Sequence, residues 1–446
     1  FRNKLPHENK TAPSFYHPRY SRIQYGYYAA LWVGGVVNGD TLVSTGIETD
    51  WKSKTRVPPM EFWPPEWPDG IIETRSNDPS VEYYSPDAKA ELEQIAHYVD
   101  TIESGWWIPY NDYDARGHRP LGLAVKQTTY SWSYKYIRDV IIVDYEISNV
   151  GGDTIHDAFV GLYYVGCNHH RGEQYYPPDD DIAGYTRWWP HEFEELGNET
   201  MNVAWLLDAD GWSWSFSWDM VRTTSAFAIA PLRIPRGASL YNFNWWYDNI
   251  GTKYNWGPRK AGTYDYPLRL FEGGLGVPRS DREKYYLMSK PEIDYSGYEA
   301  ALDHTHQGWL PPHEYGDKIA DGYLPEFVVS YGPTTIPPDG ATNFAVVMAI
   351  GKDIHYDRSA FYDLFDPHQP QPFIDQLDFE DLMTNVRWAK LVYDNPGVDT
   401  DFDGDSGKYF DRFDELRGET IKIYYEGDGV PDLRGASPPP PPEVRV

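Results

Sequence analysis

Apolar and polar residues alternate along several segments of the chain, which is typical of β-strands that bury one face. The first of these segments runs from Tyr25 to Val37, and after a turn at Asn38-Gly39 a second apolar segment covers residues 41–44. Because an Asn-Gly pair accepts positive φ angles, these residues predict a β-hairpin.

Aromatic residues show the same alternation in two further segments. They occupy every second position over residues 130–136 and again over residues 212–218. In a strand, positions two apart face the same side of the sheet, so the rings of each segment share one face. We expect both segments to be strands whose aromatic face lies in a core.

Continuous apolar runs are typical of strands that are buried on both faces. Such runs occur at residues 140–143 and 327–329, and residues 343–350 are another long strand candidate. Together these strands predict sheet packed on sheet, because an apolar sheet face must be buried against another layer. The expected fold is mainly β, with a large antiparallel β-sandwich architecture.

The expected domain organisation follows from the extent of these signals. The sandwich is predicted over residues 25–435, as one unit or as two packed subdomains divided near residues 190–280. Residues 1–24 are predicted to form an extended arm. Residues 436–446 contain a proline run and predict a stiff linker into a further module, so we expect the chain to be a piece of a longer polypeptide.

Two short helices and long loops complete the expected fold. Ser85, before a proline, is a helix start signal, and apolar residues at helical spacing follow from Ala88 to Val99. A second helix is predicted from Asp378 to Tyr393, before an Asn-Pro-Gly stop. Loops rich in Pro, Trp and Asp are predicted at residues 58–69 and 175–190.

Charge and composition restrict the possible partners. The chain of 446 residues has 39 Lys and Arg against 68 Asp and Glu, a net charge of −29 that repels nucleic acid and attracts cations. Its single cysteine, Cys167, excludes an intramolecular disulfide and a cysteine-based zinc site. No apolar run approaches the roughly 20 residues of a membrane span, so no transmembrane segment is predicted.

Motifs that carry a family resemblance lie, in order, at residues 31–44, 110–130, 139–163, 286–289, 331–340 and 427–432. In this order they resemble the β-rich domain of large secreted bacterial proteins of the Bacteroidetes type. In that family the domain precedes fibronectin type III modules, and export commonly uses type IX secretion. The resemblance implies an extracellular or cell-surface location. Where the family usually has an Asp-x-Asp pair, this chain has residues 166–170, Gly-Cys-Asn-His-His, so that metal site is not carried over.

The sharpest chemical motif is an acidic loop with a glycine turn. Asp399, Asp401, Asp403 and Asp405 alternate around Gly404, as the oxygen ligands of calcium loops do, and we expect calcium as the cofactor. Asp411 lies one place beyond the position where an EF-hand has its last ligand, so the loop is not a standard EF-hand. The alternative interpretation is a solvated acidic loop.

Other groups of possible metal ligands favour simpler interpretations. Residues 179–181 and the pair Asp208 and Asp210 resemble calcium ligands, but in so acidic a chain we interpret them as solvated turns. The histidines lack a helical His-Glu-x-x-His spacing, so they are interpreted as surface residues, and a zinc or copper site is the alternative. These histidine groups are His304, His306 and His313 with Glu314, and His169 and His170 with Glu173.

Tryptophans in Pro- or Asp-flanked segments are candidates for stacking on sugars or for a protein interface. Adjacent tryptophans cannot both point inward from one strand, which favours such a role for the pairs. The candidates are Trp63, Trp67, Trp106, Trp107, Trp188, Trp189, Trp245 and Trp246. Three Asp-Thr-apolar triplets predict possible O-glycosylation at Thr41, Thr101 and Thr154.

No sequence motif identifies an enzyme, since the chain lacks a nucleophile elbow, a phosphate-binding glycine loop and a dinucleotide fingerprint. The leading hypothesis is a secreted structural or adhesive protein that assembles with itself or with other surface proteins through aromatic interfaces, stabilised by calcium. The alternative is a polysaccharide-binding module or glycan-processing enzyme that uses the loop tryptophans. A metallopeptidase-associated domain is a third hypothesis.

Overall fold

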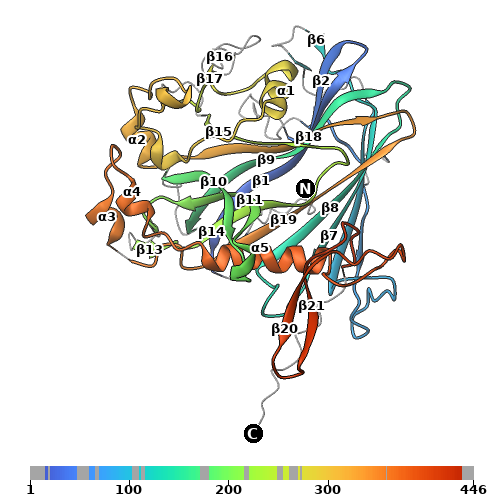
Figure 1. The fold of residues 1–446 in the computed structure, drawn as a ribbon. Helices are drawn as coiled ribbons and strands as arrows, with labels where there is room; N and C mark the ends of the chain where they lie inside the picture. Colours follow the sequence, from blue (N-terminus) through green and yellow to red (C-terminus); the bar gives the residue numbers. More distant parts are fainter. Residues whose placement is uncertain are drawn as a thin grey trace.

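A computed structural model describes residues 16–18, 21–47, 60–65, 70–102, 110–111, 116–170, 180–214, 220–248, 255–260, 270–271, 274–357 and 359–433. Within these residues the protein is mainly β, with two large antiparallel sheets and short helices (Figure 1). This confirms the fold class expected from the alternation of apolar and polar residues. Among the described residues, no helix has the length and apolar character needed to cross a membrane.

The smaller of the two large sheets has five strands in the order β15-β18-β9-β1-β2. Its strands are β1 (Ile23–Val37), β2 (Asp40–Thr45), β9 (Ile155–His170), β15 (Leu240–Tyr247) and β18 (Pro325–Ile336). β1 and β2 form the predicted hairpin, with Val37 paired to Asp40. The predicted apolar run at residues 327–329 lies inside β18, between β15 and β9, and is fully buried.

The larger sheet has eight strands in the order β10-β11-β14-β19-β8-β7-β4-β3. Its strands are β3 (Ile72–Arg75), β4 (Leu92–Asp100), β7 (Leu123–Ser131), β8 (Val140–Asn149), β10 (Asp181–Pro190), β11 (Asn198–Asp208), β14 (Ala226–Arg233) and β19 (Ala341–Gly351). The apolar runs at residues 140–143 and 343–350 lie in β8 and β19, as predicted, but β8 is not buried on both faces because Ile141 is 39 % exposed. β11, β14 and β15 all come from residues 190–280 and belong to the two large sheets.

The inner faces of the two sheets form one continuous core, because alternate residues of each strand point toward the other sheet. Tyr164 of β9 stacks on Phe227 of β14 with ring centroids 4.5 Å apart, which joins the sheets across the sandwich. Leu162 and Val329 of the small sheet belong to the same core as Val346 of the large one. The predicted sheet-on-sheet core is therefore confirmed.

A helix covers the outer face of each large sheet (Figure 1). α5 (Glu380–Tyr393) packs Leu382 and Val386 against small residues of the eight-stranded sheet such as Ala228 and Ala349. α1 (Asp281–Ser289) packs Leu287 against the outer face of the five-stranded sheet. The predicted helix from Asp378 to Tyr393 is confirmed as α5, whereas α1 was not predicted.

The remaining elements are short. The small sheets are β5 (Tyr110–Asn111) with β6 (Arg116–Gly117), β12 (Trp212–Trp214) with β13 (Met220–Arg222), β16 (Leu270–Phe271) with β17 (Gly274–Leu275), and β20 (Lys408–Asp414) with β21 (Glu419–Glu426). The other helices are α2 (Gly316–Ala320), α3 (Ala360–Leu364) and α4 (Gln371–Ile374), with 3-10 turns η1 (Glu194–Leu196), η3 (Gly297–Glu299) and η4 (Thr305–Gln307).

Three local predictions were wrong. The segment from Ala88 to Val99 is not a helix, because residues from Leu92 onward form β4 between β3 and β7. The aromatic strand at residues 130–136 ends at Ser131, and a turn follows in which the Ile137 and Arg138 amides both donate to the Tyr134 carbonyl. The long loop expected at residues 175–190 contains β10.

Adjacent tryptophans do both become buried in one strand, contrary to the expectation for Trp245 and Trp246. Both lie in β15 and both are 0 % exposed. Trp245 belongs to the core between the sheets. Trp246 points to the outer face, where its ring stacks on Tyr163. Because α1 covers that outer face, β15 is buried on both of its faces.

Candidate metal centre

Three aspartates converge at one end of the eight-stranded sheet. Asp180 lies directly before β10, Asp208 is the last residue of β11, and Asp210 follows in the next turn. One carboxylate oxygen of each lies within 4.8 Å of the others, so the group could hold a metal ion. Both motifs were interpreted as solvated turns from the sequence, but the pairing of β10 with β11 brings them together.

Backbone contacts fix this junction. Asp181 of β10 pairs with Asp208 of β11, and the Ala209 amide donates to the Asp180 carbonyl at 2.7 Å. Gly322 lies against Asp180: its φ is +105°, and a Cβ there would come within 2.4 Å of the Asp180 backbone. Only glycine fits such a close approach at positive φ. The loop after α2 therefore packs directly on the backbone of Asp180.

Asp208 is the buried member of the group, with 0 % exposure. Its carboxylate accepts hydrogen bonds from the amides of Gly211 (2.8 Å) and Trp212 (3.1 Å), and from the Thr223 hydroxyl. Burial raises the pKa of Asp208 well above its usual range, and the charges of Asp180 and Asp210 raise it further. Neighbouring negative charge and low polarity thus both oppose its ionisation.

The buried Asp208 has no ion pair with a basic side chain among the described residues. Within the described residues, neither Asp208 nor Asp210 forms an ion pair with a lysine, arginine or histidine side chain. His355 contacts the Asp208 carbonyl oxygen through Nε2 at 2.7 Å, but burial lowers the pKa of His355 to about 4, so the ring is neutral at pH 7. The Arg222 guanidinium donates to the His355 carbonyl instead. A bound cation would supply the missing positive charge.

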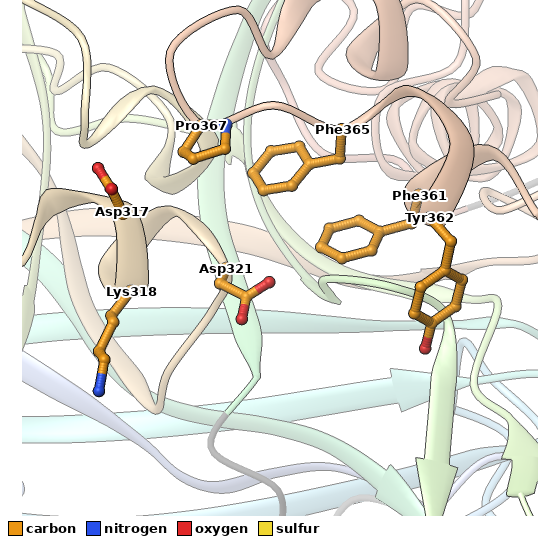
Figure 2. A pocket seen from close by; sticks show the side chains of 7 residues that line it. All are labelled: Asp317, Lys318, Asp321, Phe361, Tyr362, Phe365 and Pro367. Carbon is orange, nitrogen blue, oxygen red and sulfur yellow. The ribbon is translucent and has the colours of Figure 1, made fainter.

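An open pocket of about 430 Å³ lies beside the aspartates, between α2 and α3. Its residues are Asp317, Lys318, Asp321, Phe361, Tyr362, Phe365 and Pro367 (Figure 2). The Tyr362 hydroxyl donates to the Asp210 carboxylate, which connects the pocket to the metal centre. Sequence reasoning did not find this pocket, because residues 317–321 and 361–367 carry no recognisable motif.

The predicted calcium loop forms a second, exposed group. Asp399, Asp401 and Asp403 bring carboxylate oxygens within 4.8 Å of one another, so this group too could hold a metal ion. The amides of Asp403 (3.2 Å) and Gly404 (3.0 Å) donate to Asp399. Asp405 instead accepts from the Gly407 amide, and Asp411 lies in β20 opposite Lys422; neither belongs to the group. A strand follows the loop, as expected for a site that is not an EF-hand.

A third group of carboxylates is buried but is neutralised by the protein itself. His118 lies between Glu61 and Asp100, with Nδ1 2.7 Å from Glu61 and Nε2 2.9 Å from Asp100. Burial disfavours the charged ring, but the charge of Glu61 and hydrogen bonds to both carboxylates outweigh burial and raise the pKa of His118 to about 10. The Thr45 amide and the Leu121 amide donate to the same carboxylates. This group therefore has an internal imidazolium as its cation.

The tryptophan candidates lie in different environments. Trp63 is buried beside Val99, and Trp189 is half-buried against the α5 side of the large sheet. Trp188 is 53 % exposed at the end of β10, with the Arg187 guanidinium 5.0 Å from its ring centroid. Trp67, Trp106 and Trp107 lie outside the described residues.

The other candidates remain separate from the metal centre. His304 stacks on Tyr295, and His313 lies near Trp256; among the described residues, no histidine belongs to a group of metal-ligating side chains. Glu173 lies outside the described residues. Of the threonines proposed for glycosylation, Thr101 is exposed, whereas Thr41 and Thr154 are partly buried.

Fold and site together define a two-sheet antiparallel sandwich protein with acidic groups that could bind metal. No protein-family model matches the chain, and no curated protein matches it either. The resemblance to secreted bacterial proteins thus stays an expectation from the sequence motifs.

Proposed function

We propose that the protein is a calcium-stabilised structural or adhesive module that works outside the cell and assembles with copies of itself. The observation that carries the proposal is the buried Asp208, which shares its site with Asp180 and Asp210 and has no basic partner within the described residues. Calcium is the expected ion because it accepts about six to eight oxygen ligands in flexible geometry. A net charge of −29 favours cation binding in general.

The extracellular location is supported by the family resemblance and by calcium availability. Extracellular modules use calcium sites with dissociation constants of roughly 10⁻⁴ to 10⁻³ M, which are occupied only where calcium is abundant. The loop at Asp399, Asp401 and Asp403 is of this exposed type. Its calcium would sit at the base of the β20–β21 hairpin.

Self-assembly is supported by apolar side chains on that hairpin, which projects from the sandwich (Figure 1). One side packs on the body, where Phe410 contacts Phe193. Away from that contact, Phe413 is 62 % exposed and Leu416 at the hairpin tip is 83 % exposed, and Phe402 in the preceding loop is 89 % exposed. Such side chains lose unfavourable contact with water when a second copy covers them.

Chelation and electron microscopy test the two parts of this proposal. Adding calcium to EDTA-treated protein is expected to raise the unfolding temperature, while magnesium at equal concentration has a smaller effect. Micrographs in calcium are expected to contain ordered oligomers or filaments. The Phe413→Ser, Leu416→Ser double variant should stay monomeric with an unchanged unfolding temperature. A monomer at high concentration that is indifferent to calcium would contradict the proposal.

Polysaccharide binding is the second candidate function, and Trp188 is the observation that favours it. Its exposed ring at the end of β10 is available for stacking on a sugar. Trp63, Trp245 and Trp246 are buried and cannot contribute. A glycan array with the wild type and the Trp188→Ala variant tests the idea: binding that the variant loses supports it, and no binding by the wild type rejects it.

A further inference from the structure

The pocket between α2 and α3 combines aromatic and acidic walls. Figure 2 shows the Phe361 ring directed toward Asp321 and the Phe365 ring directed toward Pro367, while the Lys318 ammonium group points away from the rings. The two phenylalanine rings stack with centroids 4.6 Å apart, and both pack on buried Phe373 behind them. The aromatic wall is therefore held in place by the core.

Negative charge faces this aromatic wall. Asp321 is exposed to solvent, yet the protein packed around its carboxylate and the charge of Asp210 raise its pKa. Tyr362 also lines the pocket and donates its hydroxyl to Asp210. At the rim, Asp317 pairs with His368 at 3.3 Å, which leaves Asp321 as the unpaired carboxylate of the pocket within the described residues.

We propose that this pocket binds a small organic cation with a primary or quaternary ammonium group. Aromatic faces attract cations through the ring quadrupole, and a carboxylate opposite the rings adds direct attraction. A volume of about 430 Å³ lies within the range of small-molecule sites and exceeds what a single metal ion fills. A neutral ligand gains hydrogen bonds there but none of the charge attraction.

Choline and its uncharged isostere 3,3-dimethyl-1-butanol test the proposal by calorimetric titration of the full chain in EDTA. Choline is expected to bind saturably and the isostere not. Asp321→Asn is expected to weaken choline binding about tenfold, and Phe361→Leu about three- to tenfold. The matched control is Asp363→Asn, the same change of charge on exposed α3 outside the pocket, which should leave binding unchanged.

Three results would overturn the proposal: no saturable choline binding, equal binding of the isostere, or equal weakening by Asp321→Asn and Asp363→Asn. Because Phe361 packs in a cluster, its variant counts only if its unfolding temperature is retained; the Asp321 variant stands independently. Repeating the titration in calcium separates this site from the metal centre. Choline binding that persists in calcium supports the proposal. Calcium that displaces choline, combined with loss of calcium stabilisation in Asp321→Asn, would assign Asp321 to the metal instead.

Discussion

Two groups of buried carboxylates in this sandwich differ in where their compensating charge comes from. Glu61 and Asp100 flank His118, whose imidazolium ring contacts both. Asp208, with Asp180 and Asp210 beside it, has no basic partner within the described residues. Burying a charge is costly, so a buried carboxylate is either paired with a cation or protonated; the raised pKa of Asp208 means that its ionised form needs a cation beside it. The difference teaches that burial alone does not mark a metal centre: within the described residues, Asp208 lacks the basic partner that Glu61 and Asp100 share.

The largest effect is expected from removing the internal cation. His118→Gln leaves Glu61 and Asp100 buried without their partner, and we expect the free energy of unfolding to fall by about 3–5 kcal/mol. Urea unfolding in calcium and in EDTA should give the same loss, because this group needs no metal. The control is His97→Gln, an exposed histidine on β4. A loss below about 1 kcal/mol would contradict the assigned role of His118.

In contrast to the His118 group, the stability contributed by the metal centre should depend on calcium. Calcium at about 100 times its dissociation constant is expected to stabilise the wild type by about 2.7 kcal/mol per site. Asp208→Asn should remove the contribution of this site, and in EDTA the variant should be at least as stable as the wild type because it buries no charge. Exposed Asp375→Asn is the control. Undiminished calcium stabilisation in Asp208→Asn would exclude this aspartate as a ligand.

The pH dependence separates the two groups further. The pKa of His118 rises from 6.5 to about 10 on folding, so its contribution is fully present below pH 6.5 and is lost as the pH rises toward 10. The difference in unfolding free energy between wild type and His118→Gln should therefore shrink from pH 7 to pH 10. Denaturant titrations across this range provide the measurement. A difference that stays constant would mean that His118 is neutral in the folded protein.

The smallest effect is expected at the exposed loop. In EDTA, Asp401→Asn with Asp403→Asn should change the unfolding free energy by no more than about 0.5 kcal/mol, because both side chains face solvent. The same variant should lower the number of bound calcium ions by one in equilibrium dialysis. If the full number is retained, the loop is a solvated acidic turn, which was the alternative interpretation of the sequence.

Elements marked by a short stretch of sequence could be predicted, whereas features that depend on contacts between distant segments could not. The β1–β2 hairpin, β18, β19 and α5 each have a period or a turn signal within a short window. β4 misled the prediction because its apolar residues also fit helical spacing, and only its pairing with β3 and β7 decides for a strand. Trp246 is buried because α1 covers the outer face; the capping box of Ser280 and Glu283 marks the start of this helix, but its polar first turns show no apolar period.

The same distinction holds for the sites. The acidic loop from Asp399 to Asp405 is contiguous, so its carboxylates were recognised together. Asp180 and Asp208 are far apart in sequence and meet only through the pairing of β10 with β11, while the contact of Gly322 with Asp180 places the segment of Asp321 beside them. Likewise His118 carries no signal of its own, since its partners come from distant segments.

The positions of β18 and β19 have a consequence for the order of folding. Each is an interior strand of its sheet, yet both come late in the chain: β18 joins β9 to β15, and β19 joins β8 to β14. Until they are available, the earlier strands of each sheet stay in two separate pieces with exposed edges. Such long-range pairing folds slowly. The sandwich therefore cannot close until residues 325–351 have been synthesised.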